Sequence, residues 1–153
     1  MADHVLEREQ ILPTAIEQAF AFFADASNLE ALTPPWLHFR IVGTGETEMA
    51  EGALIEYRLR LHGIPIRWRT RIEEWRPTER FVDRQIRGPY VLWHHTHTFR
   101  EREGRTEMRD LVRYRLPLGP LGEIGHRMLV RRDLERIFDY RRDTIVELLA
   151  NTS

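Results

Sequence analysis

The chain has 153 residues, the length of one ordinary domain, and its 42% hydrophobic and 31% charged composition is that of a folded globular protein. All 23 basic residues are arginine, which excludes lysine chemistry, and the lack of cysteine excludes thiol nucleophiles, disulfides and zinc–thiolate sites. The formal charge of −1 argues against a protein that coats nucleic acid. We expect one domain over residues 1–153, cytoplasmic, with no signal peptide and no membrane span.

The N-terminal part predicts one strand and two short helices. Residues 5–12 alternate in polarity, which indicates a strand. The segment Thr14–Glu17 has the spacing of a capping box, and Ser27–Glu30 repeats it, so a helix is expected to begin at each. Pro34-Pro35 must end the second helix, because a proline disfavours helical conformation in the residue before it.

The middle of the chain, residues 36–116, has the two-residue hydrophobic period of strands. Short turns join these strands, which predicts an antiparallel meander. His62-Gly63 and Glu103-Gly104 suit two-residue hairpin turns. The predicted strands cover residues 36–42, 53–61, 64–75, 81–87, 90–102 and 105–116, and a turn rich in glycine and glutamate covers residues 43–51.

The C-terminal part is predicted to be helical after the break at Pro117–Pro120. An apolar stripe at helical spacing runs from residue 130 to residue 149. Leu121, Ile124 and Met128 do not lie on the same side of a continuous helix as this stripe, so a short lead-in turn is expected to join the main helix near Arg127. A long amphipathic helix must bury its stripe, and the concave face of a curved sheet is the available partner. The prediction is therefore an α+β fold, with a seven-stranded curved antiparallel sheet wrapped around a long C-terminal helix and two short helices after the first strand.

Four local motifs add to this order of elements. They are Asp25-Ala-Ser-Asn-Leu followed by Leu32-Thr-Pro-Pro-Trp36, Arg87-Gly-Pro-Tyr90, Trp93-His-His-Thr-His-Thr-Phe99, and Tyr114-Arg-Leu-Pro-Leu-Gly-Pro-Leu-Gly122. Over essentially its whole length, the chain resembles the helix-grip fold of the START/polyketide-cyclase (SRPBCC) superfamily, and within it a small bacterial cyclase/dehydrase-like, ligand-binding subgroup.

The resemblance implies a cavity between helix and sheet that holds an apolar small molecule. It does not imply one chemistry, because members include carriers, sensors and enzymes. Some relatives are joined to, or encoded beside, NAD-dependent epimerase-like proteins, which makes such a protein a candidate partner.

The densest cluster of titratable side chains lies in the strand at residues 93–99. His95 and His97 share one face of that strand. With a two-residue turn after it, three cross-strand pairs are expected: Trp93 with Tyr114, His97 with Asp110, and Phe99 with Met108. A carboxylate beside a buried imidazole favours the imidazolium, so His97 and Asp110 are a candidate acid/base dyad.

Three interpretations of the histidines stay open. They orient Asp110 inside the barrel and have no further role, because buried polar groups need partners. Alternatively, they line a ligand cavity and donate to a carbonyl or hydroxyl group of the ligand. The third interpretation is metal binding, but His-x-His with one carboxylate leaves a third strong ligand undefined by spacing. We expect neither a metal nor a cofactor.

Binding of a small, largely apolar ligand, lipid-, polyketide- or isoprenoid-like, is the function that these features favour. The predicted ligand-binding residues are Tyr57, Trp68, Trp93, His95, His97, Met108, Asp110, Tyr114 and Phe138. The alternative is a cofactor-independent cyclase/dehydratase-type enzyme. In it, His97, assisted by Asp110, removes a proton next to a carbonyl, while Tyr57 or Tyr114 donates to the developing oxyanion. The side of the sheet on which Asp83 and Gln85 lie depends on the length of the loop at Gly88-Pro89.

A second alternative rests on the arginine-rich hairpin at residues 58–71. Its arginines alternate away from the apolar face and are Arg58, Arg60, Arg67, Arg69 and Arg71. Guanidinium groups bind phosphate bidentately, so this hairpin is a candidate docking surface for a protein or RNA. The simpler interpretation is a solvated outer face balanced by nearby glutamates. Nucleic acid is not expected as a partner, because no solvent-facing aromatic side chain accompanies the arginines.

Overall fold

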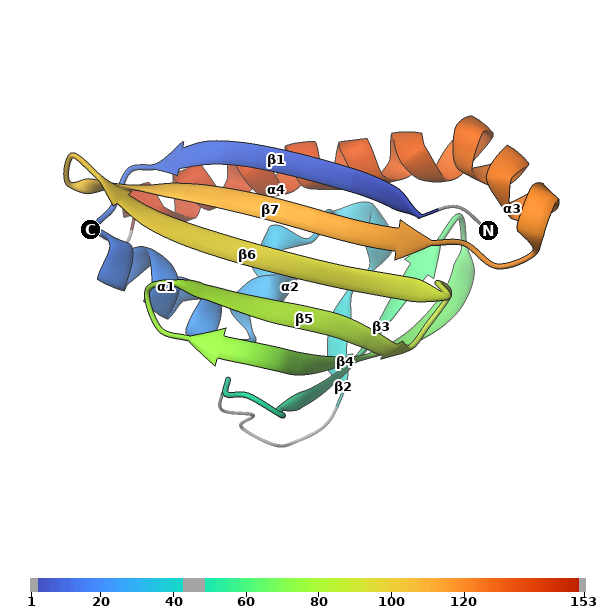
Figure 1. Cartoon of the computed structure of the whole chain (residues 1–153), viewed down its shortest axis with the longest axis horizontal. Coiled ribbons are helices and arrows are strands. Elements are labelled where there is room, and N and C mark those ends of the chain that lie inside the picture. Colours follow the sequence, from blue (N-terminus) through green and yellow to red (C-terminus); the bar gives the residue numbers. More distant parts are fainter. Residues whose placement is uncertain (1–2, 43–48, 152–153) are drawn as a thin grey trace.

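The computed structural model describes residues 3–42 and 49–151. They form a seven-stranded antiparallel sheet in the order β1-β7-β6-β5-β4-β3-β2, and α1, α2 and α4 lie behind it in Figure 1. The strands are β1 His4–Leu12, β2 Arg40–Val42, β3 Leu54–Leu61, β4 Ile64–Arg76, β5 Arg80–Arg87, β6 Leu92–Arg102 and β7 Arg105–Arg115. The helices are α1 Ile16–Ala24, α2 Asn28–Leu32, the 3-10 turn η1 Pro35–Leu37, α3 Gly119–Gly125, the π-helical turn η2 His126–Val130 and α4 Arg131–Asn151. The predicted helix-grip fold is confirmed.

Turn chemistry sets the register of two hairpins. His62 and Gly63 have φ angles of 50° and 81° between β3 and β4, and Glu103 and Gly104 have 54° and 78° between β6 and β7. Positive φ at both central residues is characteristic of the type I′ turn, whose twist matches that of the flanking strands. The three cross-strand pairs predicted between β6 and β7 are present: Trp93 with Tyr114, His97 with Asp110 and Phe99 with Met108.

Two local predictions are wrong. Residues 36–42 do not form one strand, because η1 and the positive φ of His38, 48°, turn the chain and leave only the short β2. Neither predicted capping box forms. Helix α1 begins after Ala15 without a side-chain cap, and Ser27 Oγ donates to Asp25 Oδ1 at 2.6 Å instead of capping α2. Most of the predicted turn at residues 43–51 lies outside the described residues.

Helix α4 covers the inner face of the sheet with its apolar stripe. Leu134, Phe138, Ile145 and Leu149 are buried. Between α3 and α4 the π-helical turn shifts the helical phase, which leaves Leu121, Ile124 and Met128 70%, 54% and 75% exposed. The π-helical turn therefore accounts for the apolar residues of α3 and η2 that do not follow the apolar stripe of α4. Among the described residues, no helix is both long enough and apolar enough to cross a membrane.

Candidate functional site

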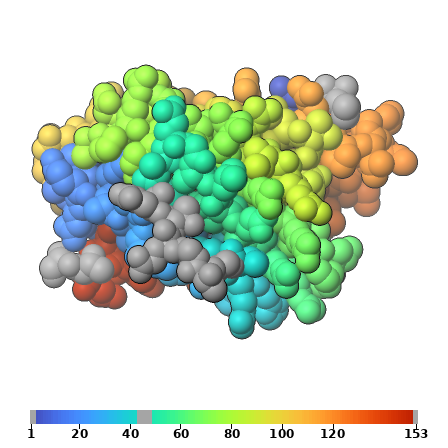
Figure 2. Space-filling model, turned by 90° about the horizontal axis from the view of Figure 1, so that it is seen from below, coloured from blue at the N-terminus to red at the C-terminus, as the bar shows by residue number. Residues whose placement is uncertain are grey.

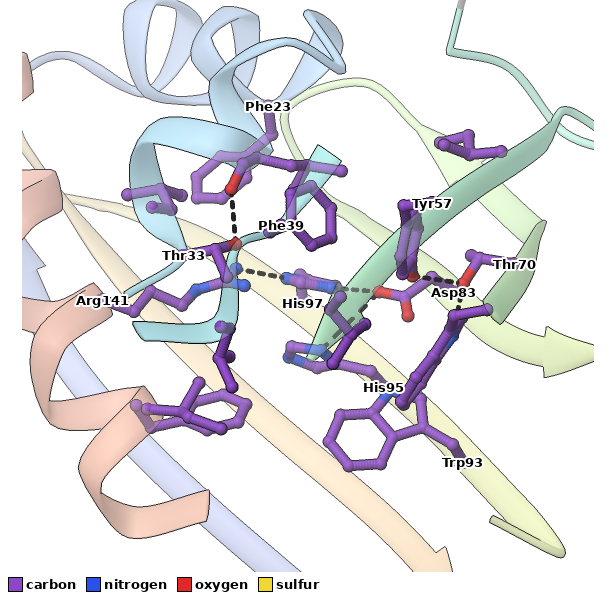
Figure 3. Close-up of a pocket in the computed structure, with 18 of the residues that line it drawn as sticks. Phe23, Thr33, Phe39, Tyr57, Thr70, Asp83, Trp93, His95, His97 and Arg141 are labelled. Atoms are coloured by element: carbon purple, nitrogen blue, oxygen red, sulfur yellow. Dashed lines mark hydrogen bonds and ion pairs between the residues drawn. The ribbon is translucent and has the colours of Figure 1, made fainter. Parts of the chain in front are cut away.

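A cavity of about 180 Å³ lies between the inner face of the sheet and the first half of α4. Aromatic side chains make up much of its wall, among them Tyr57, Trp68, Tyr90, Trp93 and Phe138. A polar group lies among them and consists of Asp83, His95, His97 and Arg141 (Figure 3). Typical ligand pockets span roughly 300–1,000 Å³, and an apolar cavity of about 150 Å³ holds benzene. The volume therefore suits a compact ligand of about one ring with small substituents.

Nine lining residues are half-buried: Leu29, Thr33, Phe39, Tyr57, Leu61, Asp83, Tyr90, Ile137 and Arg141. Most of the apolar ones lie on α2, on the segment that follows it, at the tip of β3 and on α4. Figure 2 shows η1, in cyan, beside the tip of the β3–β4 hairpin, in green. A hydrogen bond of 2.7 Å between His62 Nε2 and Asp133 Oδ2 ties the tip of this hairpin to α4.

In the aromatic part of the wall, the hydroxyl group of Thr70 is the shared hydrogen-bond partner of Tyr57 and Trp68. Tyr57 lies opposite Trp68 across β3 and β4. The Tyr57 hydroxyl is 2.6 Å from Thr70 Oγ1, and Trp68 Nε1 donates to the same oxygen at 3.0 Å. Burial raises the pKa of Tyr57, and the charge of Asp83 raises it further. Tyr57 is therefore a neutral phenol that can donate a hydrogen bond to a ligand.

In the polar group, the imidazoles of His95 and His97 lie between the carboxylates of Asp83 and Asp110. His97 Nε2 is 2.6 Å from Asp83 Oδ2, and His95 Nε2 is 2.8 Å from Asp110 Oδ1. The two rings stack with their centroids 3.6 Å apart. Strand alternation explains the arrangement, because Asp83 pairs with His95 in the β5–β6 register and Asp110 pairs with His97 in the β6–β7 register.

Arg141 completes this cluster, and the sequence analysis missed it. Its Nη2 is 3.3 Å from His97 Nδ1 and 3.8 Å from Asp110 Oδ1. The same His97 Nδ1 lies 3.3 Å from Asp110 Oδ1, so Arg141, His97 and Asp110 meet on one side of the cluster while His97 Nε2 meets Asp83 on the other. The signal that could have found Arg141 is its place between Phe138 and Ile145, on the buried stripe of an otherwise amphipathic helix.

The carboxylates of the cluster are ionised and His95 is neutral. Burial alone raises the pKa of Asp110, but Arg141 and the two histidines outweigh burial and hold it well below its usual value. Burial also raises the pKa of Asp83, and His95 and His97 reverse that effect. The pKa of His95 is lowered to about 4 by burial and by His97. At neutral pH the cluster therefore combines an uncharged His95 with the carboxylates of Asp83 and Asp110 and the guanidinium of Arg141.

The structure places most of the predicted ligand-binding residues in the cavity wall. Those that line it are Tyr57, Trp68, Trp93, His95, His97 and Phe138. Three others lie elsewhere: Met108 packs in the core beside Phe99, Asp110 lies behind the histidines, and Tyr114 bonds to His126 Nε2 at 2.7 Å.

The predicted pair is in contact, with His97 Nδ1 3.3 Å from Asp110 Oδ1, but it is part of a larger cluster. The shorter hydrogen bond of His97 goes to Asp83, and that of Asp110 goes to His95. The unbroken β5–β6 register pairs Asp83 with His95, which decides the side that the length of the Gly88-Pro89 loop had left open. Asp83 faces the cavity, whereas the Gln85 amide bonds the backbone of Tyr90.

Two groups of side chains have the composition of a metal site. They are Asp83 with His95 and His97, and His4 with Glu123 and His126. In both groups the imidazoles stack with centroids 3.6 Å apart, at 25° and 17° between planes. A metal lies in the plane of each imidazole it binds, so nearly parallel rings do not direct their nitrogens to one point. The observed arrangement suits hydrogen bonding, and metal binding would require a ring to rotate.

Fold and cavity together define a helix-grip protein with an apolar, partly enclosed binding space. Residues 12–138 match the model of the family described as polyketide cyclase/dehydrase and lipid transport, and the chain belongs to this family of the SRPBCC superfamily. A comparison with the sequences of curated proteins finds no match.

Solved structures share the fold at low sequence identity. The Zhui aromatase/cyclase from a Streptomyces species is 13% identical, with a TM-score of 0.76 over 97% of this chain and 94% of that one. A protein from Thermus thermophilus is 18% identical, with a TM-score of 0.73 over 98% and 99%. A nucleoside-diphosphate sugar epimerase from Corynebacterium glutamicum is 21% identical, with a TM-score of 0.68 over 93% of this chain but 28% of that one. These likenesses concern the fold, and an epimerase-like partner stays a prediction.

Proposed function

We propose that the protein binds a compact, largely apolar ligand that carries one anionic or strongly accepting oxygen group. The observation that carries this proposal is a half-buried guanidinium in the wall of a largely apolar cavity. The Arg141 guanidinium carbon is 5.5 Å from the Phe23 ring and 5.8 Å from the Phe138 ring. Among the described residues only its Nη2 approaches acceptors, His97 Nδ1 and Asp110 Oδ1, which leaves its remaining N–H groups for a ligand.

Calorimetric titration with three probes of one ring size tests the proposal: ethylbenzene, 4-ethylphenol and 4-ethylbenzoate. A charged hydrogen bond contributes about 1.5–3 kcal/mol, so Arg141→Gln should weaken 4-ethylbenzoate binding by about 10- to 100-fold. Ethylbenzene binding should change less than about threefold. Arg132→Gln, an exposed arginine on the same helix, is the matched control.

Two results would contradict the proposal. Equal loss of all three probes in Arg141→Gln would mean that the guanidinium supports the fold and not the ligand's oxygen group. Absence of binding by any probe, together with no ligand mass in native mass spectrometry of freshly purified protein, would remove the binding function itself.

A second candidate function is proton transfer next to a carbonyl, as in a cyclase or dehydratase. The short bond between His97 and Asp83 at the cavity wall favours it, with Tyr57 as the donor to a developing oxyanion. Both nitrogens of His97 are engaged, so a ligand must displace Arg141 before His97 can accept a proton at Nδ1. The test is exchange of the α-protons of phenylacetone in D₂O, followed by NMR. Exchange at the buffer rate excludes the proton-transfer role for this ketone class, and exchange that survives Asp83→Asn excludes the role of Asp83.

A further inference from the structure

The outer face of the sheet carries its charges in two different patterns. On the half built from β1, β6 and β7, arginine faces glutamate twice, with Arg109 opposite Glu9 and Arg100 opposite Glu107, and faces arginine once, where Arg102 lies opposite Arg105 beside the turn. On the half built from β2 to β5, arginine faces glutamate once, where Arg69 lies opposite Glu56, and faces arginine five times. One of these five pairs, Arg76 with Arg80, lies beside a turn. The other four are Arg40 with Arg58, Arg58 with Arg67, Arg69 with Arg87, and Arg71 with Arg84. These seven residues are called the arginine surface below.

Like charges directly opposite each other destabilise a sheet. Two carboxylates lie within reach, since Glu56 pairs with Arg69 and Glu73 pairs with Arg71. Over residues 3–42 and 49–151, the other members of the arginine surface have no carboxylate within 4.0 Å: Arg40, Arg58, Arg67, Arg84 and Arg87. The fold therefore tolerates a concentration of positive charge that does nothing for the stability of the sheet.

The arginine surface is also hollowed. A hollow of about 90 Å³ is bordered by Arg58, Arg67, Arg69 and Arg87, with Glu56 as the carboxylate in its wall. A neighbouring hollow shares Arg58 and Arg67 and adds His38 and Arg60. Guanidinium groups match the oxygens of phosphate bidentately. Three of the four arginines around this space, Arg58, Arg67 and Arg87, have no carboxylate partner among the described residues, so they can form an anion site of phosphate size.

We propose that the arginine surface binds a ligand with two neighbouring phosphate groups, one in each hollow. This site lies on the other side of the sheet from the cavity: Tyr57 and Trp68 line the cavity and also border the smaller hollow, and the arginines alternate with them along β3 and β4. Bound phosphate would neutralise the facing arginines and remove their repulsion. The diphosphate belongs either to a small free molecule or to phosphate groups of a lipid surface.

Thermal unfolding with inorganic pyrophosphate tests the proposal, with sodium chloride of equal ionic strength as the reference. Pyrophosphate should raise the midpoint by about 2–4 °C beyond chloride, because a ligand of the folded state stabilises it. The double variant R58Q/R87Q should lose this rise and bind pyrophosphate at least about tenfold more weakly by calorimetry. Arg113→Gln is the matched control, since Arg113 is exposed on the same face but lies opposite Val5 and His94.

Sedimentation with phosphatidylcholine vesicles, with and without phosphatidic acid, distinguishes the two sources. Binding to phosphatidic acid that R58Q/R87Q loses and R113Q keeps assigns the site to a lipid surface, whereas a response to pyrophosphate alone assigns it to a free molecule. An equal shift by chloride, retention of binding in R58Q/R87Q, or binding of single-stranded RNA without any response to pyrophosphate or phosphatidic acid would overturn the proposal.

Discussion

Arg141 and Arg67 lie on opposite sides of the same sheet and meet opposite electrostatic conditions. Arg141 has a side chain that is 15% exposed, and it lies beside His97 and the ionised Asp110. Arg67 is exposed and faces another arginine, Arg58. Inside the protein an uncompensated charge costs several kcal/mol, whereas facing charges in water cost about 1 kcal/mol or less. The inner cluster must therefore be complete for the fold to be stable, and the outer face is free to hold charge for another purpose.

The largest effect is expected from breaking the inner cluster. Asp110→Ala leaves Arg141 and His95 Nε2 without their carboxylate, and should lower the free energy of unfolding by about 4 kcal/mol. Urea denaturation at pH 7 measures it. Asp133→Ala, which removes the carboxylate paired with the exposed His62, should cost less than about 1 kcal/mol. Similar losses in the two variants would mean that the buried Asp110 contributes no more to stability than the exposed contact between Asp133 and His62.

Acid should weaken the inner cluster through His95. Its pKa is about 4 when folded and 6.5 when free, so the unfolded chain takes up a proton between these values and the folded chain does not. Stability should therefore fall by about 3 kcal/mol as the pH drops from 6.5 to 4, which urea denaturation across this range will show. His95→Gln should flatten the decline. His62→Gln should leave its slope unchanged, and a wild-type protein equally stable at both ends of the range would refute the role of His95.

Removing a neutral hydrogen bond on the inner face should have an intermediate effect. Thr70→Val deletes the hydroxyl that Tyr57 and Trp68 share, so two polar groups in the cavity wall lose their partner. The expected cost is about 2 kcal/mol by thermal or urea unfolding. Thr98→Val, on the exposed side of β6, should change stability by less than about 0.5 kcal/mol. A cost at Thr98 that matches the cost at Thr70 would argue against the inner network.

The smallest change in stability is expected on the outer face, where a substitution should stabilise the protein instead of destabilising it. Arg67→Gln removes a charge that faces Arg58, so it should raise the free energy of unfolding by about 0.3 kcal/mol in low salt. The gain should vanish in 0.5 M sodium chloride, because salt screens exposed charges. Arg109→Gln, whose cross-strand neighbour is Glu9, should lower stability under the same conditions. Destabilisation by Arg67→Gln in low salt would show that the arginine surface is not under repulsion.

Local chemistry made much of the sheet and part of the site predictable. The turns at His62-Gly63 and Glu103-Gly104 follow from which residues accept positive φ, and the register of the hairpins follows from the turns. Alternation then places His95 and His97 on the inner face. The strand predicted for residues 36–42 failed because two prolines and the left-handed His38 turn the chain, which an alternating pattern does not reveal.

By itself, the sequence determined the order of elements, the register of the tight hairpins and the face of the side chains next to them, because these depend on neighbours a few residues apart. Tertiary structure decided which charges meet. The β5–β6 register set the pairing of Asp83 with His95, and the packing of α4 brought Arg141 to the histidines across 44 residues of sequence. Such contacts depend on how a helix settles against a curved sheet, which the packing of the whole core determines and no local pattern encodes.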